Sequence, residues 1–305
     1  MNEIRAVAKL CLSAGDDHIV AVLRHGPLPN SSYVYLDMEL CELNLDQYIR
    51  KDWDQRMRDK VPQFTTRDEL GPAINAAQIW NIMADISSGV AFIHSRGEIH
   101  RDLKPRNGRP LIMNVCLQRT VLYCCGKKKW KVGDFGLTSE GTTNRAAVTR
   151  YSRGSPSYRA PELVTDDDSH TFTNKVDIWA LGCILYEIVL GKKPFPSDLA
   201  VFQYYMEYRS SAETSPLIRE IESMTFPDPS STQMLQKTLV AMLDLDPTKR
   251  PPARVLVSMF KGACMDLLAC TVGTGPWHWT EECLTGLREF TSDVVMGEYH
   301  LYFNY

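Results

Sequence analysis

The sequence predicts an α+β fold in which a few strands come early and helices form most of the remainder. Strand-like runs occur at residues 18–26 and 32–40, whereas later apolar segments repeat at helical spacing. The chain has 305 residues, 44% of them hydrophobic, which is enough for one large domain or two lobes with a real core. These observations favour a small mixed part followed by a larger helical part.

The first expected elements alternate between helix and strand. Residues 1–12 predict an amphipathic helix that precedes the two strand-like runs. A short helix is expected at about 45–58, and a longer one over 76–95 whose apolar residues on several faces indicate burial. The segments "VLYCC" and "KWKVGDF" flank a Gly-Lys turn and predict a hairpin, with the basic run 126–131 exposed in its turn.

The later elements are helical. A second buried helix is expected over 175–191, because Gly191, the two lysines after it and Pro194 form a stop signal. Helices are also expected at about 198–209 and 231–243.

Composition argues against several classes of protein. A net charge of −3 provides no global basic field for nucleic acid or a membrane surface. No apolar run approaches the ~20 residues that cross a bilayer, and the acidic Glu3 argues against a signal peptide. The nine cysteines lack metal-ligand spacing, so we expect reduced thiols and an intracellular location, cytoplasmic or nuclear. Oligomeric state is left open.

Two short motifs carry the chemistry. "HRDLKPRN" places Asp102 and Asn107 on either side of Lys104, and "VGDFGL" places Asp134 after a strand. Phosphoryl transfer needs a carboxylate near the acceptor hydroxyl, oxygen ligands for Mg²⁺, and cations against the developing charge. A lone Asp102 or Asp134 would more often be a solvated or capping carboxylate. The motifs together, in this order, predict phosphoryl transfer.

Several segments in order resemble the eukaryotic protein kinases, from Asn2 to about Ala253. They are "YLDMELC", "IHRDLKPRN", "KVGDFG", "GSPSYRAPEL", "KVDIWALGCILYEIVLGKKPF" and "LDLDPTKRP". Lys104 within "DLKP" resembles the serine/threonine-specific branch. The resemblance implies a protein-kinase-like fold, ATP and Mg²⁺ as cofactors, and a serine or threonine hydroxyl of a protein substrate as the acceptor.

The resemblance also implies a role for each matching residue. Asp102 would orient the substrate hydroxyl and accept its proton, while Lys104 contacts the γ-phosphate; Asn107 and Asp134 would hold Mg²⁺. The implied nucleotide-binding set consists of the gatekeeper Met38, the backbone of Glu39 and Cys41, Leu122 beneath the adenine, and Glu3 of the αC helix. The implied structural set consists of an apolar column of Val7, His100 and Phe135, a lock between Glu162 and Arg250, and Asp177 as the anchor of the catalytic loop.

Residues 134–162 resemble an activation segment. A phosphate on Thr149 or Ser152 would pair with Arg101, and Ser155 is expected to face the catalytic carboxylate. For each single hydroxyl, an ordinary polar loop residue is the simpler interpretation. The same holds for His100 as a core histidine and for Cys41 as a small apolar residue.

The chain departs from the family pattern at its start. The Gly-rich loop and the strand with the ATP-binding lysine, the partner expected for Glu3, are not found. Loss of one preorganised charge-stabilising group commonly costs roughly 10²–10³ in turnover. The sequence therefore predicts an impaired kinase, with a non-catalytic pseudokinase or scaffold as the alternative.

A second departure follows Asn107, where residues 108–120 look inserted before the strand at "VLYCC". We expect the insert to loop out; in the alternative, "PLIMNVCL" replaces that strand. The insert and the missing start are hypothesised to be translated intervening sequence and a truncated gene model.

The expected domain organisation has three parts. They are a remnant of the kinase N-lobe over 1–40 with its hinge at 38–41, a C-lobe over 41–259, and a C-terminal extension of unknown role over 260–305.

Overall fold

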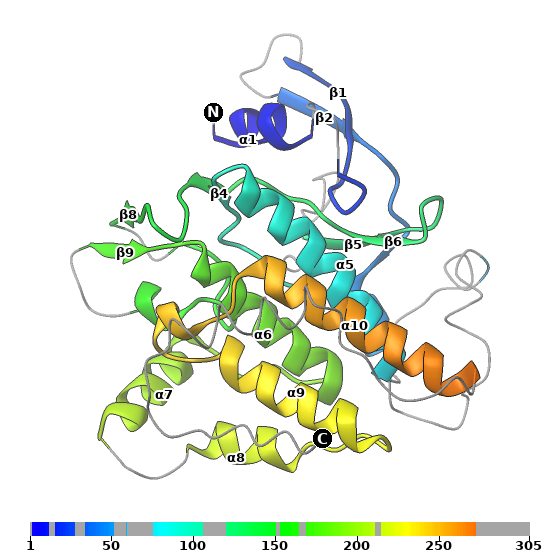
Figure 1. The fold of residues 1–305 in the computed structure, drawn as a ribbon. Helices are drawn as coiled ribbons and strands as arrows, with labels where there is room; N and C mark the ends of the chain where they lie inside the picture. Colours follow the sequence, from blue (N-terminus) through cyan, green and yellow to red (C-terminus); the bar gives the residue numbers. More distant parts are fainter. Residues whose placement is uncertain are drawn as a thin grey trace.

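The computed structural model describes residues 2–11, 16–27, 34–51, 59, 76–105, 120–150, 153–164, 169–210 and 215–272. Within these ranges a smaller part with one helix and two strands lies above a larger, mainly helical part (Figure 1). The expected α+β class is therefore confirmed. None of the helices in these ranges is long and apolar enough to cross a membrane.

The smaller part contains helix α1 (Asn2–Leu10) and the antiparallel strands β1 (Val22–Pro27) and β2 (Val34–Met38). The first strand was expected to begin at residue 18, and this was wrong. The His18 amide donates to Asp16 Oδ1 at 2.8 Å, which forms a turn in which Ile19 makes only an isolated bridge to Val132.

Helix α2 (Leu45–Arg50) is shorter than predicted. Asn44 caps its N-terminus in a capping box with Gln47. Lys51 then adopts a left-handed conformation with φ of 55°, which ends the helix; the expected continuation to residue 58 lies largely outside the described residues.

A three-stranded sheet connects the two parts. Its order is β3 (Leu43–Asn44), β5 (Val121–Cys124) and β6 (Lys129–Val132), all antiparallel. The predicted hairpin is present, with Val121 opposite Val132. The basic run at its turn is exposed only in part, because Lys131 is 3% exposed. The expectation of a wholly exposed basic run was wrong at this residue, which points inward from β6.

Two short strand pairs flank the loop at residues 100–105. They are β4 (Glu98–Ile99) with β7 (Ser139–Glu140), and β8 (Ala147–Thr149) with β9 (His170–Phe172). The first pair joins the strand before this loop to the start of the segment 134–162.

Two buried helices organise the larger part, as predicted. They are α5 (Ala76–Ser95) and α6 (Lys175–Leu190). Gly191, with φ of 67°, ends α6 in the left-handed conformation that glycine tolerates best. Gly89 of α5 allows a close approach, because a Cβ there would lie 2.7 Å from the His18 carbonyl oxygen.

The remaining helices complete the lower half of the larger part. They are α7 (Asp198–Ser210), α8 (Pro216–Ser223), α9 (Pro229–Met242) and α10 (Ala253–Val272), with 3₁₀ turns at Pro161–Leu163 and Pro247–Lys249. Helices α7 and α9 confirm the two helices expected there, whereas the sequence reasoning made no prediction for α8.

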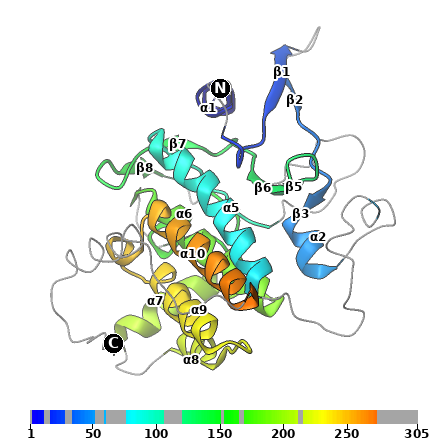
Figure 2. The same cartoon turned by 45° about the vertical axis from the view of Figure 1, so that its right-hand side comes forward.

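Helix α10 packs along α5 (Figures 1 and 2). Fully buried Phe260 stacks on Trp80 with ring centroids 5.8 Å apart. The helix runs without a break through residue 260, where the C-terminal extension was expected to start.

Candidate active site

The loop at residues 100–105 is held by one buried carboxylate. Asp177, in the first turn of α6, accepts hydrogen bonds from the backbone amides of His100 at 2.9 Å and Arg101 at 2.8 Å. His94 Nε2 contacts the same carboxylate at 2.9 Å. Arg101 has a positive φ of 71°, so Asp177 stabilises a backbone turn that an arginine rarely adopts.

Asp177 stays charged despite its burial. Burial alone would raise its pKa, but His94, His100 and the amide of Arg101 lower the pKa below its ordinary value. The ionised carboxylate can thus accept all of these bonds at once.

Three side chains meet at the end of this loop. Asp102 Oδ1 accepts from the Ser155 hydroxyl at 2.8 Å, and Asp102 Oδ2 accepts from Lys104 Nζ at 2.6 Å. Lys104 also donates to the Ser155 hydroxyl, and its ammonium is buried. A carboxylate, an ammonium and a hydroxyl are therefore in mutual contact.

Asp134 follows β6 and is close enough to Asp102 and Lys104 to feel their charges. It has a positive φ of 61°, and the buried ring of Phe135 packs against His100 with centroids 5.7 Å apart. His100 Nε2 donates to the carbonyl oxygen of Gly133 at 2.9 Å, which fixes the other side of the turn. Asp134 is thus held by packing on both neighbouring residues.

Charge around Asp134 favours a bound cation. Burial raises the pKa of Asp134, and Asp102 raises it further, whereas His100 and Lys104 act in the opposite direction. A divalent cation would offset both the burial of the Asp134 charge and its repulsion by Asp102. Carboxylate oxygen is also a ligand that Mg²⁺ prefers. Asn107, the second expected ligand, lies outside the described residues. In the described ranges, no three His, Cys, Asp or Glu side chains gather as a metal site by themselves.

Three of the expected nucleotide-binding residues, Met38, Glu39 and Cys41, lie at the end of β2 and in the connection to β3. Met38, at the end of β2, is 40% exposed, and the Glu39 amide donates to the Ala21 carbonyl at 3.0 Å. Cys41 is half-buried between β2 and β3, and burial raises the pKa of its thiol to about 12. Leu122 lies in β5, next to β3. Glu3 belongs to α1, but its side chain lies outside the described residues.

Glu39 has a partner that the sequence did not suggest. Its carboxylate accepts from Lys131 Nζ at 2.6 Å and from the Ala21 amide at 2.7 Å. Burial alone would raise the pKa of Glu39, but Lys131 and this amide lower it below its ordinary value. The ion pair ties the connection after β2 to β6.

Arg101 retains unused donor capacity. Its guanidinium lies over the ring of Phe172 at 4.5 Å, and its Nε and Nη2 atoms have no hydrogen-bond partner among the described residues. Burial, and then Arg153, lower the pKa of Arg101 to about 10. Thr149 lies in β8, the strand paired with the β9 strand that carries Phe172, while Ser152 lies outside the described residues.

Glu162 and Arg250 contact each other through two hydrogen bonds, at 2.7 and 2.8 Å. Arg250 is fully buried, lies over the Trp179 ring at 5.1 Å and donates from Nε to the Asp244 carbonyl at 2.8 Å. This contact closes the end of the segment 134–162 onto the larger part.

The sequence did not predict several long-range contacts in and near the site. His94 contacts Asp177, and Lys131 pairs with Glu39. Glu98 accepts from Arg5 of α1. His94 and Asp177 are 83 residues apart, and Arg5 and Glu98 are 93 apart, so no local pattern could have paired them. Only the fold brings them together.

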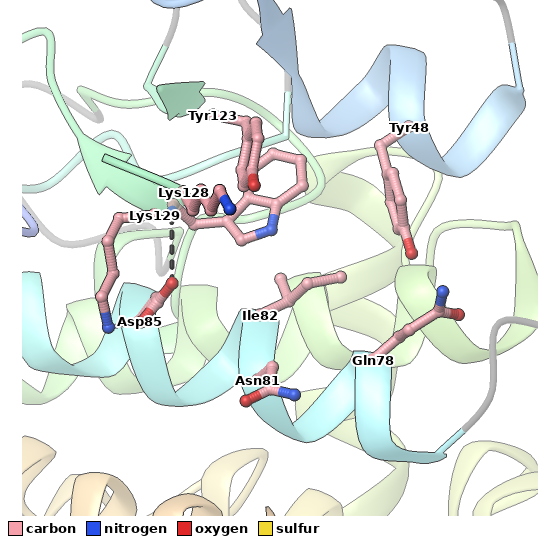
Figure 3. Close-up of a pocket in the computed structure, with 9 residues that line it drawn as sticks. Tyr48, Gln78, Asn81, Ile82, Asp85, Tyr123, Lys128 and Lys129 are labelled. Carbon is pink, nitrogen blue, oxygen red and sulfur yellow. Dashed lines mark hydrogen bonds and ion pairs between the residues drawn. The ribbon is translucent and has the colours of Figure 1, made fainter. Parts of the chain in front are cut away.

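A separate pocket of about 250 Å³ lies between α2, α5 and the β5–β6 hairpin (Figure 3). Asp85 lies at its edge and accepts from the Trp130 amide at 3.0 Å and from Lys129 Nζ at 3.1 Å. Its lining consists of Tyr48, Gln78, Asn81, Ile82, Asp85, Tyr123, Lys128, Lys129 and Trp130. It contains none of the site residues expected from the sequence, so it is distinct from the Asp102 cluster.

A carboxylate at a hydroxyl, an ammonium beside both, and a second carboxylate after a strand form an arrangement typical of phosphoryl-transfer enzymes. Residues 1–259 match the family model of the protein kinase domain. The chain therefore belongs to the protein kinase family.

The relatives that it resembles are serine/threonine kinases. It is 28% identical to mouse serine/threonine-protein kinase 16 over 68% of this chain, and 29% identical to Xenopus laevis serine/threonine-protein kinase PLK1 over 77%. It is 26% identical to serine/threonine-protein kinase BCK1/SLK1/SSP31 of Saccharomyces cerevisiae over 72%. The matches span 59%, 31% and 14% of these relatives' own lengths, respectively.

Proposed function

We propose that the chain transfers the γ-phosphoryl group of ATP to serine or threonine hydroxyls of a protein substrate. One observation carries the proposal. The Ser155 hydroxyl lies 2.8 Å from Asp102 Oδ1 and also contacts Lys104, so it occupies the position that an acceptor hydroxyl requires. In this interpretation Ser155 stands in for the substrate.

The proposed roles follow from the charges. Asp102 orients the acceptor hydroxyl and takes its proton, while the ammonium of Lys104 stabilises charge on the transferred group. Asp134 and Asn107 would hold Mg²⁺, which when bound supplies charge stabilisation on the phosphates. The raised pKa of Asp134 supports this, since a buried carboxylate near another carboxylate favours a cation.

The nucleotide is proposed to lie beside the connection between β2 and β3. Met38 would lie behind the adenine, the backbone of Glu39 and Cys41 at its edge, and Leu122 beneath it. The ion pair between Glu39 and Lys131 supports this placement, because it directs the Glu39 side chain toward β6 and holds the connection after β2 in position. Glu3 of α1 would face the phosphate side.

Phosphorylation of the activation segment is proposed to order it. The buried Arg101 guanidinium supports a phosphate-binding role toward Thr149 or Ser152, because two of its nitrogen atoms have no hydrogen-bond partner in the described part of the chain. An intracellular location, cytoplasmic or nuclear, stays a prediction from cysteine usage.

The direct test is transfer from radiolabelled ATP, with Mg²⁺, to a generic acceptor protein. Asp102→Asn should reduce transfer by at least about 10², the range for a positioned acid or base. Asp17→Asn, which changes a carboxylate in an exposed ion pair with Lys127, is the matched control and should leave transfer unchanged. If the wild-type chain transfers nothing under these conditions, the proposal is wrong and the non-catalytic scaffold is favoured.

A further inference from the structure

Helix α1 is attached to the larger part by charged side chains. Arg5 donates through Nη1 and Nη2 to the two oxygens of Glu98, at 2.7 and 2.9 Å. Lys9 Nζ donates to the same carboxylate at 2.7 Å. Arg5 and Lys9 are four residues apart, so they lie on one face of the helix. One carboxylate of β4 therefore receives two cations from α1.

The exposure of these groups is unequal. The Glu98 side chain is 0% exposed, whereas Arg5 is 36% and Lys9 is 40% exposed. Burial alone would raise the pKa of Glu98, but Arg5 and Lys9 lower it below its ordinary value, so Glu98 stays ionised. If α1 moved away, an ionised carboxylate would remain buried without these cations, which is strongly unfavourable.

The carboxylate lies at a sensitive place in the chain. Glu98 precedes His100 by two residues, and it pairs across the β4–β7 ribbon with Glu140. Glu140 also accepts from Arg5 Nη1, at 2.9 Å. Figures 1 and 2 place α1 next to this ribbon. The position of α1 is therefore coupled both to the loop that carries Asp102 and to the start of the activation segment.

The same helix carries groups that depend on its position. Val7 is buried in the core that also contains Phe135, and Glu3 lies one turn before it. A helix that shifts would move Val7 out of this core. An electrostatic contact that holds the helix thus also holds Val7 in this core.

We propose that Glu98, Arg5 and Lys9 form a clamp of positioning residues that docks α1 onto β4, the strand that leads into the catalytic loop. The docking itself is a structural claim, and only its effect on phosphoryl transfer rests on the proposed function. Through Glu98, the larger part restrains the position of α1. This restraint does not depend on an ion pair between Glu3 and a lysine on a strand.

Hydrogen exchange of the full chain tests the docking. In Arg5→Met/Lys9→Met, whose changes lie at half-exposed positions, the amides of residues 6–11 should exchange about tenfold faster, the scale of a lost hydrogen bond to a charged group. The α6 amides should not change. Arg5→Lys/Lys9→Arg keeps both charges and should retain most of the protection. Lys127→Met, which removes an exposed ion pair, is the control and should leave α1 unchanged.

Glu98→Gln gives an independent readout. It should accelerate α1 exchange as the double variant does, and added salt should loosen α1 in the wild type but not in either variant. Unchanged α1 exchange in the double variant would overturn the clamp, whatever the activity.

If the wild type transfers phosphate, the double variant should lower kcat and raise the KM for ATP, and the charge-keeping variant should rescue both. Impaired kcat and KM without a change in α1 exchange would also contradict the clamp. Faster α1 exchange in a chain that transfers nothing would support the clamp while refuting the proposed function.

Discussion

Helix α6 and the β1–β2 ribbon show how differently the two parts of this kinase-family chain are covered. Every residue of α6 from Lys175 to Ile188 is buried, whereas in β1 and β2 only Val22 is buried. Leu23 is 65% exposed, and Leu40, just after β2, is 70% exposed. A two-stranded ribbon is marginal by itself, so the smaller part depends on its contacts with the larger one.

Most of the stability of the chain therefore resides in the larger part. In the larger part even polar groups are buried and paired, as Arg250 and Asp177 illustrate. Charged pairs tie the smaller part to the larger one, among them the clamp on Glu98, the contact of His18 with Asp85 and the pair of Glu39 with Lys131. We therefore expect changes in the larger part to unfold the chain and changes in the smaller part to loosen it locally.

The largest effect is expected for Glu162→Ala. It leaves the fully buried Arg250 guanidinium without its carboxylate, which should reduce the free energy of unfolding by about 3 kcal/mol. Urea unfolding measures this. Lys192→Met, which breaks the exposed pair with Glu220, should leave the midpoint unchanged. Similar losses for the two variants would contradict the difference drawn between buried and exposed pairs.

Asp177→Asn should reduce the free energy of unfolding by about 2 kcal/mol. The two carboxylate oxygens accept from the amides of His100 and Arg101, and the single side-chain oxygen of asparagine cannot replace both. Because the pKa of Asp177 is lowered on folding, its charge stabilises the fold above the unfolded value of about 3.9 and this contribution is lost as pH falls further. Acid unfolding followed by circular dichroism should therefore be less steep in Asp177→Asn. An identical acid profile would show that Asp177 does not contribute in this way.

His18 provides a smaller, pH-dependent effect in the opposite direction. Asp85, and then Asp16, raise the pKa of His18 against the effect of burial. The charged His18 side chain thus stabilises the fold fully below its unfolded pKa of about 6.5, and this stabilisation is lost as pH rises through the raised pKa of the folded state. As pH rises through this range, the backbone amides of residues 16–27 should exchange hydrogen faster than the intrinsic pH dependence of exchange explains. His18→Gln should abolish this additional acceleration. An acceleration that persists in His18→Gln would refute the assignment.

The smallest effect on stability is expected for Leu23→Thr/Leu40→Thr. Both side chains are mostly exposed, so the unfolding midpoint should hardly change. Self-association, measured by sedimentation velocity, should decrease because less apolar surface is offered at an open ribbon. A large loss of stability would mean that these leucines are covered in solution.

The same contrast explains what the sequence could predict. Helices α5 and α6 were predicted almost to the residue, because long apolar periodicity and the stop at Gly191 are local signals. The start of β1 and the end of α2 were missed, because a turn at Asp16 and a left-handed Lys51 decide them. Candidate residues such as Asp177 and Glu39 came from motifs, but their partners His94 and Lys131 come from distant segments.

The proposal that Asp102, Lys104 and Asp134 belong to a site competent for Mg-ATP is tested most directly by the melting temperature with and without Mg-ATP. We expect a rise for the wild type and none for Asp134→Asn. That variant should melt no lower than the wild type without ligand, since its buried charge is removed. No rise in the wild type, or an equal rise in Asp134→Asn, would refute this Mg-ATP site.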